Sequence, residues 1–220
     1  MANLIEMCWS WVDERFKLKD DLKTMLKKPV PSYAANPVYC LGGIAFLLYL
    51  VQLFTGVLLA RYYVPTPEGA YESVKFIMQE VPLGSLFRSV HHWGSNMMIA
   101  AIVLHMIRVF FMGAYKKPRE LNWVVGIFLL LLTVVFGFSG YLLPWDQLSF
   151  WATTVGLQIP SAIPVIGPIM LKIFVGGAEV EAGTLMRFYF MHVFLLPFGL
   201  FFLLGLHFLM VRKQGISEAL

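Results

Sequence analysis

Five histidines lie in long apolar stretches of this 220-residue chain: His91, His92, His105, His192 and His207. An ionisable side chain in an apolar span is costly unless it is paired or bound, so each of them is a candidate functional residue. Neutral imidazole is a common metal ligand, and two imidazoles that face each other across helices can hold the iron of a haem. The alternative is a hydrogen bond between helices, which is the commoner role of a single histidine in such a position.

The spacing of the histidines separates these alternatives. His105 follows His91 by 14 residues, and His207 follows His192 by 15. At 100° per residue, these intervals return to within ~40° and ~60° of the starting face and rise by ~21–22 Å along a helix. Each helix therefore presents two imidazoles on one face at two depths. The pattern predicts two bis-histidine haem sites, with His91 and His192 near the outer membrane face and His105 and His207 near the inner face.

His92 does not fit either pair. It points ~100° away from His91 and has no partner at a matching depth. We therefore expect it to be a polar residue near the membrane interface and not an axial ligand.

Glycines repeat the same interval in the two apolar stretches that lack histidine. Gly42 and Gly56 are 14 residues apart, and so are Gly126 and Gly140. Glycine is frequent in membrane helices, and close helix packing alone would explain each of these residues. The shared interval favours a second interpretation, in which these positions make room for the edges of two haems inside a four-helix bundle.

The elements that must position these residues are membrane spans. Hydrophobic residues make up 59% of the chain and charged residues only 14%, with a mean hydropathy of +0.72. A bilayer requires about 20 consecutive apolar residues for a spanning helix. Four stretches satisfy this requirement: residues 38–60, 90–112, 123–144 and 188–211. The predicted fold class is an all-α membrane protein, a single domain over residues 1–220 in which four transmembrane helices enclose two b haems.

A further uncharged segment, residues 147–171, is a candidate fifth span. It contains Pro160, Pro164 and Pro168, and such a segment cannot satisfy its own backbone in lipid. We interpret it as a surface-lying or re-entrant connection.

The distribution of basic residues supports four spans. With four crossings, eleven of the seventeen Lys and Arg residues lie on one side of the membrane, which predicts that both termini are cytoplasmic. The pI near 9.1 thus indicates membrane orientation in a lipid bilayer and no nucleic-acid partner. Residues 9–28 alternate charged and apolar side chains, which predicts an amphipathic helix on the cytoplasmic surface.

The chain then shows motifs of a known family. Its specific parts are Tyr39-Cys40-Leu41-Gly42-Gly43, Arg88-Ser89-Val90-His91, Lys116-Lys117-Pro118-Arg119-Glu120-Leu121, Gly140-Tyr141-Leu142-Leu143-Pro144-Trp145-Asp146-Gln147 and Arg212-Lys213-Gln214-Gly215-Ile216. The sequence resembles the short cytochrome b of quinol:cytochrome c or plastocyanin oxidoreductases, cytochrome b6 and its bacterial respiratory relatives, over nearly its whole length.

The resemblance implies a function. Family members oxidise quinol on the outer side, send one electron to a Rieske iron–sulfur protein, and pass the other through two b haems to quinone on the cytoplasmic side, with proton translocation. The partners it implies are a three-helix subunit IV-type protein that carries a Pro-Glu-Trp-Tyr segment, the Rieske protein and a c-type cytochrome, in a homodimeric complex. This chain has no such segment, so we expect it to be inactive alone; it supplies Gly140–Trp151 to the outer site.

The resemblance also implies a third haem, of c type, attached through one thioether to Cys40. Arg88 precedes His91 by three residues and Arg108 follows His105 by three, so each arginine could bind a haem propionate; snorkelling to the interface is the alternative.

His92 departs from the chloroplast-type pattern, which usually has Arg after the first ligand. The His-His-Trp form resembles the versions in Gram-positive bacteria. This favours menaquinol as the donor and a bacterial cell membrane as the location, with a thylakoid-type membrane as the lesser alternative.

Two other functions are compatible with histidines in apolar spans. One is the haem b membrane anchor of a hydrogenase or formate dehydrogenase, whose ligands do not form two same-face pairs on two helices. The other is a transporter or assembly subunit that uses buried histidines as a proton relay. Among the predicted cofactors, b-type haem distinguishes the redox functions from this last one.

Overall fold

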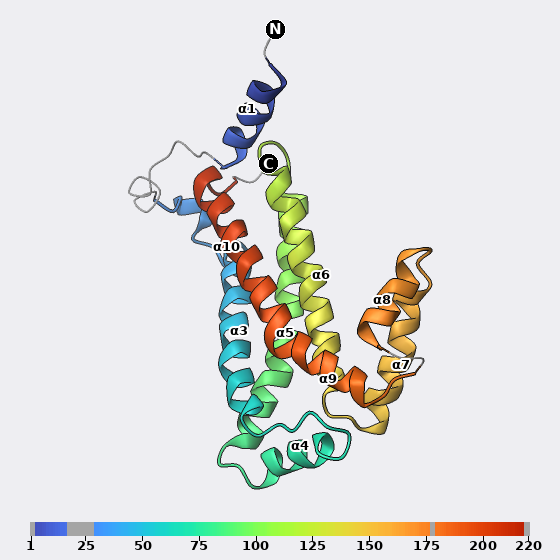
Figure 1. Ribbon diagram of the computed structural model, residues 1–220. Coiled ribbons are helices and arrows are strands. Elements are labelled where there is room, and N and C mark those ends of the chain that lie inside the picture. Colours follow the sequence, from blue (N-terminus) through green and yellow to red (C-terminus); the bar gives the residue numbers. More distant parts are fainter. Residues whose placement is uncertain (1–2, 17–28, 177–178, 218–220) are drawn as a thin grey trace. The chain divides into compact units, whose positions relative to one another are not determined.

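Four long helical segments are the main elements of the computed structural model, which describes residues 3–16, 29–176 and 179–217 (Figure 1). Three of them are single helices, α3 (Pro37–Ala60), α5 (Gly84–Phe111) and α6 (Glu120–Leu142). The fourth is one continuous run from Ala182 to Gln214. It consists of α9 (Ala182–Phe190), the π-helical turn η2 (Met191–Leu195) and α10 (Leu196–Gln214). No strand is present in the described residues, so the predicted all-α membrane class with four spans is confirmed.

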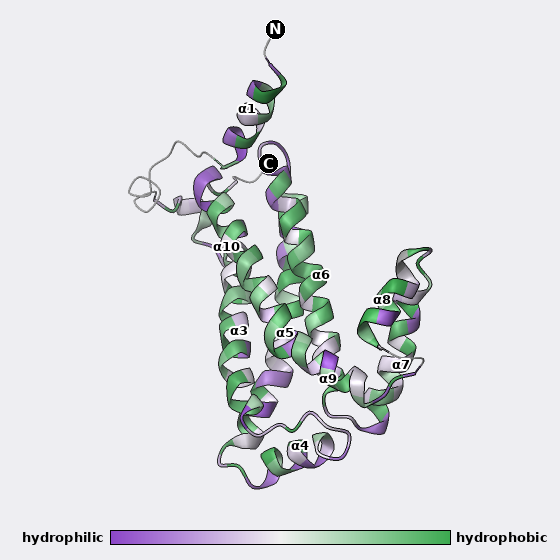
Figure 2. Cartoon of the chain, viewed as in Figure 1, coloured by the Kyte–Doolittle hydropathy of each residue, from purple (hydrophilic) through white to green (hydrophobic). Residues whose placement is uncertain are grey.

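The helices extend beyond the apolar stretches that predicted them. The second span begins at Gly84 and not near residue 90, and the fourth runs over 182–214 and not over 188–211. Hydropathy marks the hydrocarbon thickness only, whereas backbone hydrogen bonding continues into the interface. Figure 2 shows the corresponding pattern, with apolar helix middles and polar residues gathered near several helix ends.

Local sequence signals set the ends of the fourth span. At its start, Glu181 and Thr184 form a reciprocal capping box that satisfies two backbone N–H groups. At its end, Gly215 adopts φ +82°, a left-handed conformation that glycine accepts without a steric penalty. Its N–H bonds to the Val211 carbonyl at 2.9 Å and closes the helix.

Most of the surface of the spans is not covered by the chain itself. Only 17–22% of the most apolar window of each span is buried within the described part of the protein. A soluble protein of this composition would expose far too much apolar surface to water. The exposed apolar surface of the spans therefore suits the hydrocarbon of a bilayer.

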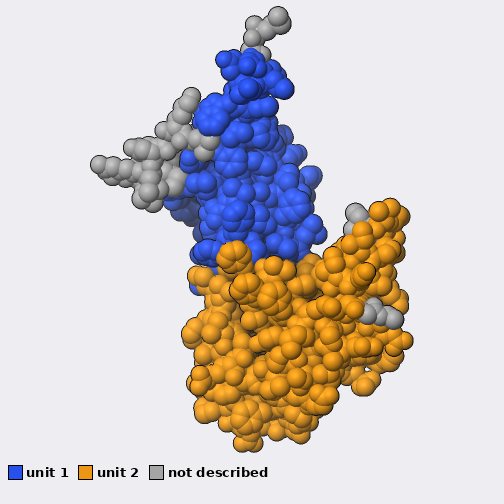
Figure 3. All heavy atoms as spheres, viewed as in Figure 1, with its two compact units in different colours: residues 1–47, 98–132, 199–220 blue, residues 48–97, 133–198 orange. Residues whose placement is uncertain are grey.

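Two compact units divide the chain, and each draws on all four spans (Figure 3). Unit 1 comprises residues 1–47, 98–132 and 199–220, and contains Cys40, His105 and His207. Unit 2 comprises residues 48–97 and 133–198, and contains His91 and His192. The single domain over 1–220 stays a prediction.

Short helices connect the spans in unit 2. Helix α4 (Ala70–Gln79) lies between the first two spans. The segment predicted as a surface-lying or re-entrant connection forms α7 (Gln147–Ser161) and α8 (Ile166–Phe174), a helical pair that the proline content concealed. Asp146 caps α7 by accepting from the Ser149 N–H at 2.8 Å. Neither helix is among the candidate spans, because both are shorter than a bilayer requires.

The N-terminal helix α1 (Leu4–Phe16) begins earlier than the predicted surface helix over 9–28, whose second half, residues 17–28, lies outside the described residues. A short 3-10 turn, Ser32–Ala34, precedes the first span. Large apolar side chains of α1 are exposed, among them Leu4, Ile5 and Trp9. This exposed apolar face agrees with a helix that lies on a membrane surface.

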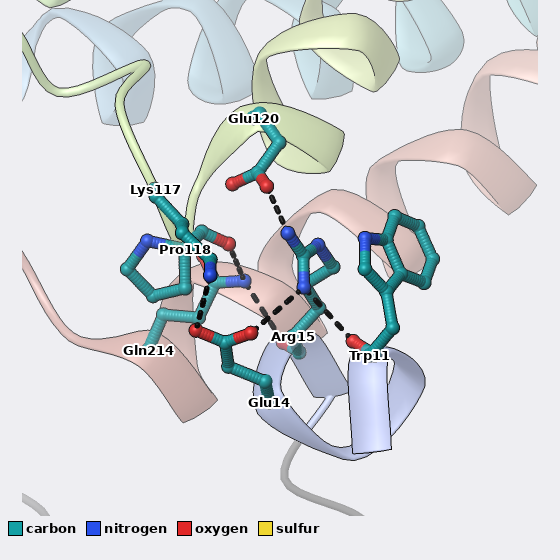
Figure 4. A network of polar contacts seen from close by, with 7 residues as sticks. All are labelled: Trp11, Glu14, Arg15, Lys117, Pro118, Glu120 and Gln214. Atoms are coloured by element: carbon teal, nitrogen blue, oxygen red, sulfur yellow. Dashed lines mark hydrogen bonds and ion pairs between the residues drawn. The ribbon is translucent and has the colours of Figure 1, made fainter. Parts of the chain in front are cut away.

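Arg15 attaches α1 to the rest of unit 1 (Figure 4). Its side chain is only 2% exposed and makes ion pairs with Glu14 and with Glu120, the first residue of α6. It also donates to the Trp11 carbonyl at 3.0 Å and lies 4.1 Å above the Trp11 ring. A buried guanidinium needs such partners, because an unpaired buried charge is strongly destabilising.

Gln214, the last residue of α10, completes this polar network. Its amide donates to the Arg15 carbonyl at 2.8 Å and to the Pro118 carbonyl at 3.1 Å. Lys117 lies 3.6 Å from the Glu14 carboxylate. Segments from three parts of the sequence are thus joined around one arginine.

Replacement of Arg15 by Met should release α1 from unit 1. The variant keeps the aliphatic stem but removes hydrogen bonds from a charged donor, a loss of about 1.5–3 kcal/mol each. We expect chymotryptic cleavage at Trp9 and Trp11 to accelerate at least about tenfold, since 1.4 kcal/mol corresponds to tenfold. The matched control is Glu6→Gln, because Glu6 accepts only from the nearby Asn3 N–H. Equal cleavage rates in Arg15→Met and wild type would contradict the role of Arg15.

Candidate haem sites

His91 and His192 face each other in unit 2. His91 lies on α5, and His192 lies in the π turn η2. Their ring centroids are 6.2 Å apart, and the ring planes make an angle of 66°. A first-row metal binds imidazole nitrogen at ~2.0–2.1 Å, so one metal ion between two imidazoles places their centroids ~6 Å apart. The observed separation is too long for a direct hydrogen bond and suits a metal ion between the rings.

His105 and His207 form an equivalent pair in unit 1. His105 lies on α5 and His207 on α10. Their centroids are 6.5 Å apart, with an interplanar angle of 79°. The structure therefore brings together both pairs that the spacing predicts, each at a separation that one iron atom would bridge. His92 is exposed and its ring lies against Trp93, apart from either pair.

Hydrogen bonds select the tautomer of His91. The Thr55 hydroxyl donates its single hydrogen to the Val51 carbonyl at 2.7 Å. With this hydrogen on the Val51 carbonyl, Oγ1 of Thr55 is the acceptor in its 2.8 Å contact with Nδ1 of His91, and the imidazole is the donor. In this arrangement Nδ1 of His91 carries the proton, and Nε2 keeps the lone pair that a metal needs.

The same argument applies to His192. Its Nδ1 lies 3.1 Å from the Phe136 carbonyl, which can only accept, and 3.0 Å from the Ser139 hydroxyl. Ser139 donates its own hydrogen to the Phe136 carbonyl at 2.9 Å. His192 is thus also an Nδ1–H donor with a free Nε2.

Three of the four predicted glycines lie against these imidazoles. A Cβ atom on Gly42 would lie 3.1 Å from Cε1 of His105, and one on Gly56 would lie 3.3 Å from Cε1 of His91. At Gly140 the distance to Cε1 of His192 would be 2.6 Å, which no real side chain tolerates.

Gly126 differs from the other three. Its nearest side-chain atom is Sδ of Met106 at 3.6 Å, an ordinary contact. The structure therefore assigns Gly126 no contact with a histidine, and its role in haem packing stays a prediction.

The two candidate propionate ligands differ in their surroundings. The Arg108 guanidinium lies 3.8 Å above the Tyr39 ring, and its Nε contacts Sδ of Met112 at 2.9 Å. Its Nη2 is buried and has no hydrogen-bond partner among the described residues, which suits an anionic group of a bound cofactor. Within the described part of the chain, the contact of the Arg88 side chain is with Sδ of Met78, at 3.7 Å.

Cys40 is a free, exposed thiol in the first turn of α3. It directly follows Tyr39, the residue beneath Arg108, and precedes Gly42 by two positions. These residues all belong to unit 1, together with His105 and His207. The only other cysteine, Cys8 on α1, is also free and exposed.

The residue types and spacing that predict the histidine pairs do not identify Thr55 and Ser139. The signal was nevertheless present, because each directly precedes one of the spaced glycines, Gly56 and Gly140. Their significance depends on which way each hydroxyl points, and that is set by the packing of the helices.

Comparisons with known proteins identify the family of the chain. The family described as cytochrome b/b6/petB matches residues 25–215. The chain belongs to the cytochrome b/b6 family. It is 48% identical to cytochrome b6 of Heliobacterium modesticaldum, over 95% of this chain and 99% of that protein. It is 44% identical to the menaquinol:cytochrome c reductase cytochrome b subunit of Geobacillus thermodenitrificans, over 99% and 100% of the two chains.

A solved structure extends the likeness of this cytochrome b to three dimensions. It is a chain of a hyperthermophilic respiratory Complex III, with a TM-score of 0.81 and 36% sequence identity. The match covers 95% of this chain but only 56% of that chain, so the present cytochrome b spans about half the length of its solved relative.

These findings confirm the family and the membrane fold predicted from the sequence. The chain is a cytochrome b6-type subunit of a bc/b6f-type complex, and such subunits belong to oxidoreductases. Its family binds b-type haem. The alternative of a hydrogenase or formate dehydrogenase anchor is not favoured.

Replacement of Gly140 by Ala should disrupt the site in unit 2. The added methyl group would overlap His192, and overpacking of this kind costs about 1–3 kcal/mol. We expect a lower b-haem content per polypeptide in the reduced-minus-oxidised spectrum. Gly43→Ala is the matched control, because nothing lies within 4 Å of a Cβ at Gly43. If both variants keep the same haem content, close approach at Gly140 is not required.

Proposed function

We propose that this cytochrome b moves electrons across the membrane from quinol oxidised on the outer side to quinone reduced on the cytoplasmic side, coupled to proton translocation. The proposal rests on one observation: two pairs of imidazoles face each other, with ring centroids 6.2 Å apart in one pair and 6.5 Å apart in the other. Two such sites in one chain suit two b haems, whose irons supply one-electron redox chemistry when bound.

The residues of the chain would hold and orient the two haems. His91 and His192 would be the axial ligands of the outer haem, and His105 and His207 those of the inner haem. Because Nδ1 of His91 and of His192 is engaged as a donor, Nε2 of each would be free to bind iron. Arg108, with its unpartnered Nη2, would bind a propionate of the inner haem, and Arg88 one of the outer haem.

A third haem, of c type, would be attached to Cys40. The thiol is exposed and free, so it can form the single thioether, and its neighbour Tyr39 lies beneath a cationic side chain. The membership of Cys40 in the same unit as the inner pair supports this position.

The turn after α6 would form part of the outer quinol site. The Tyr63 hydroxyl donates to the Leu143 carbonyl at 2.6 Å and its ring stacks on Tyr189 at 5.3 Å. Trp145 adopts φ +53°, and Asp146 caps the helix that follows. These contacts give the Gly140–Trp151 segment a defined backbone on which a partner subunit can complete a site.

Partner subunits would supply what this chain lacks. A three-helix subunit IV-type protein with a Pro-Glu-Trp-Tyr segment would complete the quinol site, and a Rieske protein and a c-type cytochrome would accept electrons, in a homodimeric complex. His92 favours menaquinol as the electron donor. The name of the Geobacillus relative, a menaquinol:cytochrome c reductase subunit, favours the same donor and cytochrome c over plastocyanin as the acceptor. The complex would lie in a bacterial cell membrane with both termini of this chain in the cytoplasm.

Removal of one axial histidine tests the pairing. His105→Ala should abolish about half of the b-type α-band in the purified complex, because one of two haems loses a ligand. His92→Ala is the control on the same helix and should keep both haems, since His92 belongs to neither pair. An intact spectrum in His105→Ala, or a complex without any b-type band, would overturn the proposed haem ligation.

The covalent haem has a separate test. The wild-type chain should keep a haem stain after denaturing electrophoresis, and Cys40→Ser should lose it while the b-type band remains. Cys8→Ser is the matched control, because Cys8 is the other free, exposed thiol. A stain that persists in Cys40→Ser would exclude attachment at Cys40.

A further inference from the structure

The two histidine pairs differ in the hydrogen bonds made by Nδ1, the ring nitrogen that would not bind iron. In unit 2, Nδ1 of His91 contacts the Thr55 hydroxyl at 2.8 Å, and Nδ1 of His192 contacts the Ser139 hydroxyl at 3.0 Å. In unit 1, Nδ1 of His105 is buried and has no hydrogen-bond partner among the described residues. A hydroxyl contact to Nδ1 is therefore present at each imidazole of the unit 2 pair and absent, among the described residues, at His105 of the unit 1 pair.

Each hydroxyl is held as an acceptor by its own helix. Thr55 donates to the carbonyl four residues earlier and Ser139 to the carbonyl three residues earlier. A serine or threonine that bonds back in this way uses its only hydrogen on the helix. Its oxygen lone pairs then remain for the imidazole, which has to donate.

Burial strengthens these two contacts. The side chain of Thr55 is 2% exposed and that of Ser139 is fully buried. A hydrogen bond is electrostatically stronger in such a low-dielectric environment than in water. Both imidazoles of the pair are therefore polarised by a nearby oxygen, and His192 is polarised by the Phe136 carbonyl as well.

We propose that Thr55 and Ser139 are positioning residues that lower the reduction potential of the haem held by His91 and His192. An imidazole that donates from Nδ1 becomes a more basic ligand at Nε2. A more basic axial ligand favours the oxidised, more positive iron, and hydrogen bonding to ligands is one of the factors by which proteins set haem potentials. The inference rests on the proposed haem ligation. It adds the two hydroxyl groups that set the reduction potential at one of the two sites.

Redox titration of the purified complex tests the inference. Thr55→Val and Ser139→Ala remove the acceptors with little change in volume. We expect the outer component of the b-type α-band to titrate at higher potential in each variant and the inner component to stay in place. In the double variant the reduction equilibrium should shift about tenfold, which is ~59 mV for one electron. The component missing in His91→Ala identifies the outer haem.

Two controls accompany this titration. Thr55→Ser keeps the hydroxyl and should keep the wild-type potential. Ser95→Ala removes a hydroxyl on α5 that donates only to the His92 carbonyl, and should shift neither component. If Thr55→Val loses its outer haem, the potential of the outer component in Ser139→Ala tests the inference by itself.

The outcomes separate this inference from the proposed function. Two b-type components with unchanged potentials in both variants would overturn the tuning and leave the haem ligation intact. Loss of the outer component in both variants would also overturn it and would assign the hydroxyls to assembly. Absence of two b-type components in the wild type would overturn the proposed function itself.

Discussion

The separation of two imidazoles across a helix pair is the constraint on which the rest of this structure depends. The ring centroids of the two pairs lie 6.2 and 6.5 Å apart, a separation that suits one metal ion between the rings and is too long for a direct hydrogen bond. Glycines on neighbouring spans make room for the rings. At Gly42, Gly56 and Gly140 a Cβ atom would lie too close to an imidazole. The apolar spans provide the scaffold, but the glycines determine whether two histidines can face each other.

Much of this architecture could be predicted from the sequence because it is periodic. The four spans follow from apolar stretches of bilayer length, and the face shared by His91 and His105 follows from helix geometry alone. The prediction is weaker where no period exists. The prolines of residues 147–171 predict irregular backbone, yet this segment forms α7 and α8. Helix α7 tolerates Pro160 because this residue is the last but one of the helix, so little helix follows the missing N–H.

The contacts that tertiary packing decides could not be predicted. The burial of Arg15 on a helix with an exposed apolar face depends on the approach of Glu120 and Gln214, which are more than one hundred residues away in the sequence. The acceptor role of Thr55 depends on a rotamer that commits its hydrogen to Val51. Similarly, Gly126 shares the glycine interval but lies against Met106, so an interval in sequence does not guarantee the same neighbour.

The π turn at Met191–Leu195 explains why the two histidine intervals are unequal. A π turn closes its hydrogen bonds one residue later than an α-helix, so it accommodates one additional residue in a single turn. His192 is the second residue of this turn, so the remainder of the turn, up to Leu195, lies inside the 15-residue interval that ends at His207. With one residue absorbed, the interval advances the helix as 14 α-helical residues do, which is the interval on α5. The fourth span thus keeps the helical phase of the second through a one-residue insertion, and the difference in count is a correction of register and not a difference in geometry.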